Sequence, residues 1–193
     1  MRPIVALGDW PIDLGTNPFP SPHIRLNVIP EGYSPPLLGT AAMPQATNKR
    51  VYVASSWSNP RQPAVVAALR GVGHEVYDFR NPGIGLPGFS WAQVDPAWRQ
   101  WSPMTFRNSL QHPAAVRGFE LDMRALASAD ATVLVLPCGR SAHLELGYAV
   151  GAGQLTFVLC DQALDMPELM YKMCTRICLD LNEVVAGLQL EAS

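Results

Sequence analysis

Glu145 is the carboxylate whose surroundings in the sequence best suit chemistry. It follows an apolar run, Val133–Leu136, and a short polar loop, near the expected start of a helix. Backbone N–H groups at a helix start are unpaired and favour an ionised carboxylate or another anion. An ionised Glu145 could act as a nucleophile, because carboxylates form covalent glycosyl intermediates that split one displacement into two easier ones. An ordinary first-turn acid would have the same sequence pattern.

Two other residues are candidates for a role in the same site as Glu145. Tyr52, on an expected strand, could donate a hydrogen bond that orients Glu145, or it is a core tyrosine with a local partner. Asp122 lies beside the apolar face of an expected helix, where a carboxylate costs free energy unless it is paired or solvated. Asp122 therefore faces a polar cavity or an arginine, or it is a surface acid in water.

The polar loop and helix start before Glu145 supply candidate ligand contacts. Ser141 is a favoured N-cap residue that could also bind phosphate. His143 could act as an acid, a base or an anion partner, or be a solvated side chain. Arg140 in this loop and Arg80 elsewhere could attract phosphate, although arginines on loops are weak evidence for a site.

Strands and helices alternate from Lys49 onward, judged by apolar periodicity and by Gly and Pro positions. Strands are expected at Arg50–Ser55, His74–Phe79, Ala131–Leu136, Leu155–Cys160 and Arg176–Leu179, and helices at Gln62–Val72, Pro113–Ser128, Ala142–Ala152, about Met166–Cys174 and Asn182–Leu190. This alternation predicts parallel pairing with right-handed crossovers. The expected fold class is α/β: a doubly wound, flavodoxin-like sheet of five parallel strands in the order 2-1-3-4-5, with helices on both faces.

The expected strand order also predicts where a ligand binds. Doubly wound sheets bind ligands at the carboxyl ends of strands, where the winding direction reverses. Here that point lies between strands one and three. It brings the loop of Ser55, Ser56 and Trp57 together with residues 137–141.

Two segments fall outside this alternation. Residues 1–47 read as an irregular, proline-rich extension, with one short strand pattern at Ile24–Val28 and aromatic anchors at Trp10, Phe19 and Tyr33; residues 48–193 form the folded domain. The connection from Arg80 to about Met104 is rich in Pro, Gly and aromatic residues. It is either a lid over a site or a short helix, about Ala92–Trp101, that packs its tryptophans into a core.

Composition excludes several classes of protein. With 193 residues, 48% hydrophobic and 16% charged residues and a net charge of −2, the chain is neither a disordered tail nor a polybasic nucleic-acid binder. We expect no secretory leader, no membrane span and a cytoplasmic location. The four cysteines show no zinc-site spacing, and dinucleotide, Walker and zinc deaminase signatures are absent, so no metal or cofactor is expected.

Three segments together resemble the nucleoside 2-deoxyribosyltransferase family and its nucleotide N-glycosidase relatives. They are Val51–Trp57 on the first strand, Asp122–Asp130 before the third strand, and Glu145–Ala149 on the following helix. The resemblance covers about Lys49 to Leu159 well, the C-terminal part loosely, and the stretch up to Thr47 not at all. Each motif alone is weak, but their order on one α/β frame is moderately specific.

The resemblance implies roles for individual residues. Glu145 would be the nucleophile on the anomeric carbon, Tyr52 its hydrogen-bonding partner, and Asp122 a residue that contacts or protonates the base. Trp57 would lie near the base. A homodimer or higher homo-oligomer in which a neighbouring subunit completes each site is also implied, without cofactor or metal.

The sequence departs from the family at the loop before Glu145. The transferases carry there an Asp that holds the sugar 5′-hydroxyl, and Gly139 occupies that position here. Ser141 and Arg140 point instead towards a phosphorylated substrate. We therefore expect an enzyme that cleaves or transfers the N-glycosidic bond of a nucleoside or nucleoside 5′-monophosphate. The alternatives are a non-catalytic nucleotide sensor and an NAD-cleaving glycohydrolase.

Overall fold

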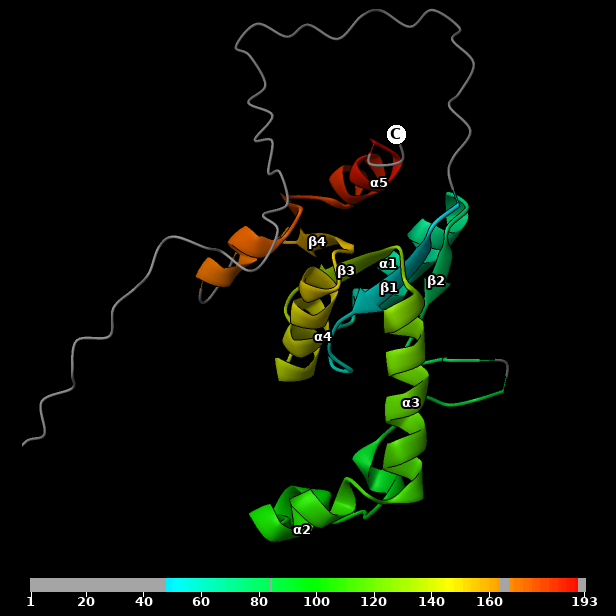
Figure 1. The fold of residues 1–193 in the computed structure, drawn as a ribbon, viewed down its shortest axis with the longest axis vertical. Coiled ribbons are helices and arrows are strands. Elements are labelled where there is room, and N and C mark those ends of the chain that lie inside the picture. Colours follow the sequence, from blue (N-terminus) through cyan, green and yellow to red (C-terminus); the bar gives the residue numbers. More distant parts are fainter. Residues whose placement is uncertain (1–47, 84, 164–166, 191–193) are drawn as a thin grey trace, which may run out of the picture. The chain divides into compact units, whose positions relative to one another are not determined.

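The computed structural model describes residues 48–83, 85–163 and 167–190, which lie in one compact unit, Ala42–Ser193. Its strands are β1 (Arg50–Ala54), β2 (Glu75–Tyr77), β3 (Ala131–Val135), β4 (Leu155–Leu159) and β5 (Arg176–Cys178). Its α-helices are α1 (Gln62–Gly71), α2 (Pro103–Ser109), α3 (Pro113–Ser128), α4 (Arg140–Gly151) and α5 (Leu181–Leu190), and Figure 1 follows them in chain order from cyan to red. The leader features at Trp10, Phe19, Ile24–Val28 and Tyr33 lie outside the described residues.

The strands form one parallel sheet in the order β2-β1-β3-β4-β5, which confirms the predicted doubly wound topology. β1 pairs with β2 on one side and β3 on the other, and the register sets Tyr52 beside both Tyr77 and Thr132. The carboxyl ends of β1 and β3 are therefore neighbours. This is the reversal point at which doubly wound sheets bind ligands.

Alternating side chains of β1 supply the two faces of the sheet. Val51 and Val53 pack in a core cluster with residues of α1 and α5. Tyr52 and Ala54 point to the opposite face, where they pack with residues of α3 and α4. Strands buried on both faces read as continuous apolar runs, which explains why the β3 sequence has no polar alternation. The face under α3 and α4 is the one that carries Tyr52.

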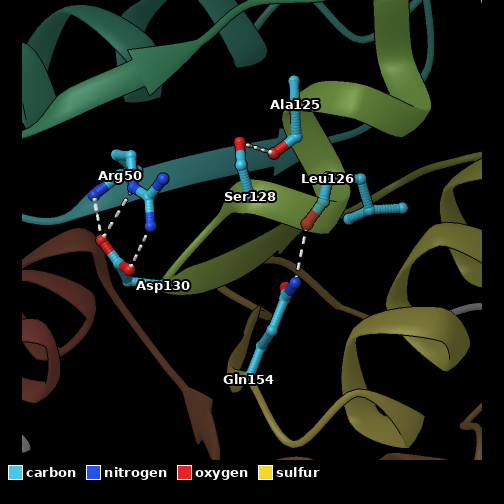
Figure 2. Close-up of polar contacts among 6 residues, drawn as sticks. All are labelled: Arg50, Ala125, Leu126, Ser128, Asp130 and Gln154. Atoms are coloured by element: carbon cyan, nitrogen blue, oxygen red, sulfur yellow. Dashed lines mark hydrogen bonds and ion pairs between the residues drawn. The ribbon is translucent and has the colours of Figure 1, made fainter. Parts of the chain in front are cut away.

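The C-terminal end of α3 is fixed to the amino ends of β1 and β4. Gln154 Nε2 donates to the Leu126 carbonyl at 2.7 Å, and Ser128 Oγ donates to the Ala125 carbonyl at 3.1 Å (Figure 2). Asp130, in the connection to β3, accepts hydrogen bonds from the Arg50 backbone N–H at 2.8 Å and from its guanidinium group at 3.0 Å. The Gln154 and Ser128 bonds supply donors to carbonyls of the last turn of α3, and the Gln154 and Arg50–Asp130 bonds hold this end of the chain segment against the sheet.

The start of α4 differs from the prediction. The N-cap is Gly139, in an extended conformation and without a side-chain cap, so the prediction of Ser141 as N-cap is wrong. The helix includes Arg140 and Ser141, and Glu145 lies in its second turn. The extended loop ends at Gly139, two residues earlier than the side-chain preference of Ser141 indicates. The proposed effect of the helix start on Glu145 is thereby reduced, because the dipole acts mainly within the first turn.

In the connection after β2, two short helical turns stand in place of the single helix of about Ala92–Trp101, and a role as a lid stays a prediction. The connection has two 3-10 helices, η1 (Trp91–Gln93) and η2 (Trp98–Gln100), followed by α2. Its aromatic rings pack on one another: Trp91 lies 4.9 Å from Phe89, 5.4 Å from Trp101 and 5.8 Å from Phe106, measured between ring centroids. The segment is thus an ordered layer with its own small aromatic core.

Other differences are smaller. β2 is shorter than the expected strand, and the expected helix before β5 is a 3-10 helix, η3 (Leu169–Met173). The apolar face predicted for α3 is only half buried: Leu126 is in the core, whereas Val116 and Phe119 are 38% and 66% exposed. None of the helices in the described ranges is long and apolar enough to cross a membrane.

Candidate functional site

Two stacked tyrosines form the floor of the site. The rings of Tyr52 and Tyr77 are parallel within 17°, with centroids 5.3 Å apart, as their register on β1 and β2 requires. The Tyr77 hydroxyl donates a hydrogen bond of 2.8 Å to Asp122 Oδ1. Asp122 comes from α3, so this bond joins the sheet to the helix above it. Tyr77 was not among the residues predicted from the sequence.

Glu145 approaches the same cluster from α4. Burial, and after it the negative charge of Asp122, raise its pKa to about 7, and hydrogen bonding with Tyr52 opposes the rise. The Tyr52 hydroxyl is buried and makes no hydrogen bond of ordinary length and angle within the described ranges. The Tyr52–Glu145 contact is therefore looser than a normal hydrogen bond, as is common in ligand-free sites.

Asp122 and Glu145 act electrostatically as a pair. Burial also raises the pKa of Asp122, against the effect of the Tyr77 hydrogen bond. Two carboxyl groups that repel each other ionise in two steps that belong to the pair. Between those steps the site holds one proton and one negative charge. That state provides an acid and a nucleophile in the same small volume.

The loops after β1 and β3 are joined by side chains. Ser55 Oγ donates to the Val135 carbonyl at 2.9 Å. Asn59 Nδ2 lies 3.1 Å from Ser55 Oγ, 3.2 Å from the Val135 carbonyl and 3.1 Å from the Pro137 carbonyl. Sequence reasoning missed Asn59, because two of its three acceptors are backbone groups more than seventy residues away along the chain.

Trp57 stands at the rim of the crevice and is 53% exposed. Its ring packs edge-on against Phe79 at 5.5 Å, and the Arg80 guanidinium lies 5.7 Å from its centroid. Arg80 Nη2 donates to the carbonyls of Ser56, Trp57 and Asn59 at 2.7–3.1 Å. Arg80 therefore holds this loop in shape, a different role from the phosphate contact considered from the sequence.

The first turn of α4 presents His143. Its Nδ1 lies 3.0 Å from the Gly139 carbonyl, which can only accept, so Nδ1 carries a proton. In the neutral ring Nε2 then accepts from the Tyr171 hydroxyl, 2.9 Å away. His143 is thus oriented by contacts on both sides.

Cys138 lies 3.6 Å from His143 Nδ1, a spacing that would suit a Cys–His nucleophile pair. The chemistry does not fit. Nδ1 is already a donor to Gly139, and burial together with the Glu145 charge raises the pKa of the Cys138 thiol to about 11. A thiol in that state is a poor nucleophile.

The structure thus gathers Tyr52, Asp122 and Glu145 in one cluster and sets Ser55, Ser56 and Trp57 beside the loop that contains Gly139. Arg140, Ser141 and His143 are exposed on the first turn of α4. A pocket lined by Phe79, Phe89 and Gln93 of the β2–α2 connection leads to Tyr77 and Asp122. In the described ranges, no group of three or more His, Cys, Asp or Glu side chains could hold a metal ion.

No family model and no curated protein matches this sequence. Among solved structures, the chain is similar to a 2-deoxyribosyltransferase from Bacillus psychrosaccharolyticus, with 19% identity and a TM-score of 0.45, over 72% of this chain and 94% of that one. It is also similar to a CMP N-glycosidase from Clostridium botulinum, with 17% identity and a TM-score of 0.41, over 72% of this chain and 98% of that one. Both are of the kinds that the motifs in the sequence resemble.

Proposed function

We propose that this protein is an enzyme that cleaves the N-glycosidic bond of a nucleoside or nucleoside 5′-monophosphate and passes the sugar to water or to another base. The observation that carries the proposal is the partly buried pair of carboxyl groups, Asp122 and Glu145, with a tyrosine hydroxyl beside each. Bond cleavage at an anomeric carbon needs an acid for the leaving group and a carboxylate for the sugar. The pair supplies both in the singly protonated form in which the proton lies on Asp122 and the negative charge on Glu145.

The proposed reaction has two steps. The Glu145 carboxylate forms a bond to the anomeric carbon as the C–N bond breaks, and the Asp122 carboxyl group gives its proton to the leaving base. The acceptor, water or a second base, then attacks the anomeric carbon and releases Glu145. The proton lost by the acceptor returns to Asp122, which restores the starting state. The Tyr52 hydroxyl orients Glu145 and tightens its contact when the site is occupied.

The remaining crevice residues would hold the rest of the substrate. We assign Trp57 to one face of the base, because half of its ring surface is free and Arg80 and Phe79 brace the other part. Gly139, Arg140, Ser141 and His143 would bind the sugar and its 5′ group. An arginine, a hydroxyl and free N–H groups at a helix start suit a phosphate better than a hydroxyl, which favours a nucleotide over a nucleoside.

The test is release of free base from a panel of nucleosides, nucleoside 5′-monophosphates and NAD, measured with wild type and with Glu145→Gln. We expect wild type to release base from at least one member and Glu145→Gln to release none while remaining folded. Glu120→Gln, the same substitution at an exposed glutamate of α3, is the matched control and should keep full activity.

Three results would contradict the proposal. Turnover by Glu145→Gln at a near-normal rate would show that Glu145 is not the nucleophile. Thermal stabilisation of wild type by a panel member without product from any would identify a nucleotide sensor. Product from NAD alone would identify the glycohydrolase alternative.

A further inference from the structure

Asn59 is a buried polar residue at the point where three strand ends meet. It is 2% exposed, and its side chain makes hydrogen bonds on both sides of the amide. Nδ2 faces three acceptors, whereas Oδ1 accepts from the Arg61 backbone N–H at 2.9 Å. This arrangement fixes the orientation of the amide, because reversing it would face an acceptor with acceptors and a donor with a donor.

The acceptors of Asn59 lie just beyond the paired parts of β1 and β3. The β1–β3 ladder ends at Ala54 and Leu134. Past that point, Ser55 Oγ and Asn59 Nδ2 both donate to the Val135 carbonyl, in place of the backbone hydrogen bonds of the ladder. Of these two side chains, only Asn59 also donates to the Pro137 carbonyl. The Asn59 carbonyl in turn accepts from Arg80 at the end of β2, at 2.7 Å.

Pro137 begins the short loop that leads into α4. Two residues later Gly139 is the N-cap, and Glu145 follows in the second turn. Tyr52, the hydroxyl nearest Glu145, lies on β1, so the distance between the two groups depends on how the β3–α4 loop sits against the β1–α1 loop. Asn59 is the side chain that bonds both loops.

We propose that Asn59 is a positioning residue that sets where Glu145 lies relative to Tyr52, and that its loss impairs the chemical step more than substrate binding. This inference rests on the function proposed above. Displacing reacting groups by as little as about 1 Å can cost about a hundredfold in rate. Fully satisfied buried polar groups are well suited to prevent such displacement, because alternative geometries leave them unpaired.

A purely local role would involve only Oδ1. That atom bonds the Arg61 backbone at the start of α1 and would support this turn wherever the β3–α4 loop lay. The local role and the positioning role make different predictions, because of the two side-chain atoms only Nδ2 contacts the β3–α4 loop.

The test compares Asn59→Ala with wild type and with Asn48→Ala. Asn48 also accepts a backbone hydrogen bond through Oδ1, from Glu75 at 3.1 Å, but at the amino ends of β1 and β2, whereas Asn59 lies beyond the carboxyl end of β1. We expect Asn59→Ala to lower kcat at least about tenfold with KM changed less than about threefold. Asn48→Ala should leave both constants unchanged.

A second measurement is independent of turnover. The ionisation of Glu145 in the ligand-free protein is followed by carbon-13 NMR of labelled glutamate side chains, with Glu145→Gln to identify the signal. We expect the Glu145 pKa to move in Asn59→Ala and not in Asn48→Ala, because burial of Glu145 and its contact with Tyr52 depend on the loop. Should Asn59→Ala not fold, the same titration is made with Asn59→Ser, which retains one donor.

The outcomes separate this inference from the proposed function. A shifted Glu145 titration supports the positioning role even if wild type releases no base, a result that would refute the proposed function alone. An unshifted titration in a folded Asn59 variant overturns the positioning role, as does a fall in kcat matched by an equal fall in Asn48→Ala.

Discussion

The two carboxyl groups of the site determine the pH dependence that we expect. The reaction needs one proton and one negative charge on the Asp122–Glu145 pair. The rate should therefore rise as the first carboxyl group ionises and fall as the last proton leaves the pair, near the Glu145 pKa of about 7. A profile of kcat/KM against pH measures both limbs, because this constant reports ionisations of the free enzyme.

The Asp122→Asn variant tests which group carries the last proton. Removing the Asp122 charge removes one cause of the raised Glu145 pKa, so Glu145 should ionise at lower pH. The variant should be slower and should lose the falling limb. A falling limb that stays near its wild-type position in Asp122→Asn would contradict the assignment of the pair.

Glu145 should also lower the stability of the protein at alkaline pH. Its folded pKa of about 7 lies above its ordinary value, so the folded state holds a proton that the unfolded state releases. The resulting stabilisation is present below the unfolded pKa and is lost as pH rises through about 7. We expect Glu145→Gln to raise the free energy of unfolding at pH 8 by about 1–3 kcal/mol.

Denaturant unfolding at pH 8 and at about pH 4 checks this prediction. At the lower pH, where wild-type Glu145 is protonated in the folded state, the difference between the two proteins should shrink towards zero. A variant less stable than wild type at pH 8 would show that Glu145 is stabilised as an anion, contrary to its burial.

Residue types revealed the chemistry of the site but not its supports. Tyr52, Asp122 and Glu145 could be singled out from their residue types, from the elements expected to carry them and from the family that their segments resemble. Tyr77 and Asn59 could not, since their importance lies in contacts with residues far away in the sequence. Knowledge of the β1–β2 register would have found Tyr77, because it is the direct partner of Tyr52.

At the scale of elements, Gly88 keeps the β2–α2 connection against the crevice. A Cβ at this position would lie 2.1 Å from the Phe79 carbonyl oxygen and 2.8 Å from the Trp57 ring. The Phe79 backbone carbonyl cannot move away from this overlap as the end of a flexible side chain could. We expect Gly88→Ala to lower the free energy of unfolding by about 1–3 kcal/mol and to displace Trp57.

Tryptophan fluorescence and denaturant unfolding measure both effects. Gly71→Ala is the control, because a Cβ at Gly71 meets no atom within 4 Å and the residue ends α1. It should be neutral or slightly stabilising. Equal unfolding free energies for the two variants would show that the connection moves freely.

Elements were predicted more closely than their ends. The order of strands and helices follows from apolar periodicity, which reflects burial on the two faces of the sheet. The start of α4 could not be read in this way, because Ser141 matches the N-cap preference while the backbone turns at Gly139. The extent of burial along α3 was also overestimated, since periodicity shows an apolar face but not what covers it.

At the scale of the molecule, the exposed apolar side chains of α3 suggest a surface through which two copies of the chain associate. Val116 and Phe119 on α3 are exposed, and so are Leu144 and Tyr148 on α4, at 76% and 42%. The two helices cover the same face of the sheet, the one that carries Tyr52. Exposed large apolar side chains on helices that cover one face of a sheet suit a protein–protein contact. A second copy of the chain, related by a two-fold axis, would bury the same residues on both subunits.

We therefore expect a homodimer through α3 and α4 that Phe119→Arg disrupts. An arginine at the centre of an apolar contact would carry an unpaired charge into it, which costs more than the contact can offset. Sedimentation analysis should show wild type as a dimer and Phe119→Arg as a monomer. Leu179→Arg, equally exposed at 66% but beyond β5, should remain dimeric. Because α4 also carries Glu145, base release should fall in the monomeric variant alone; a monomeric wild type would refute this interface.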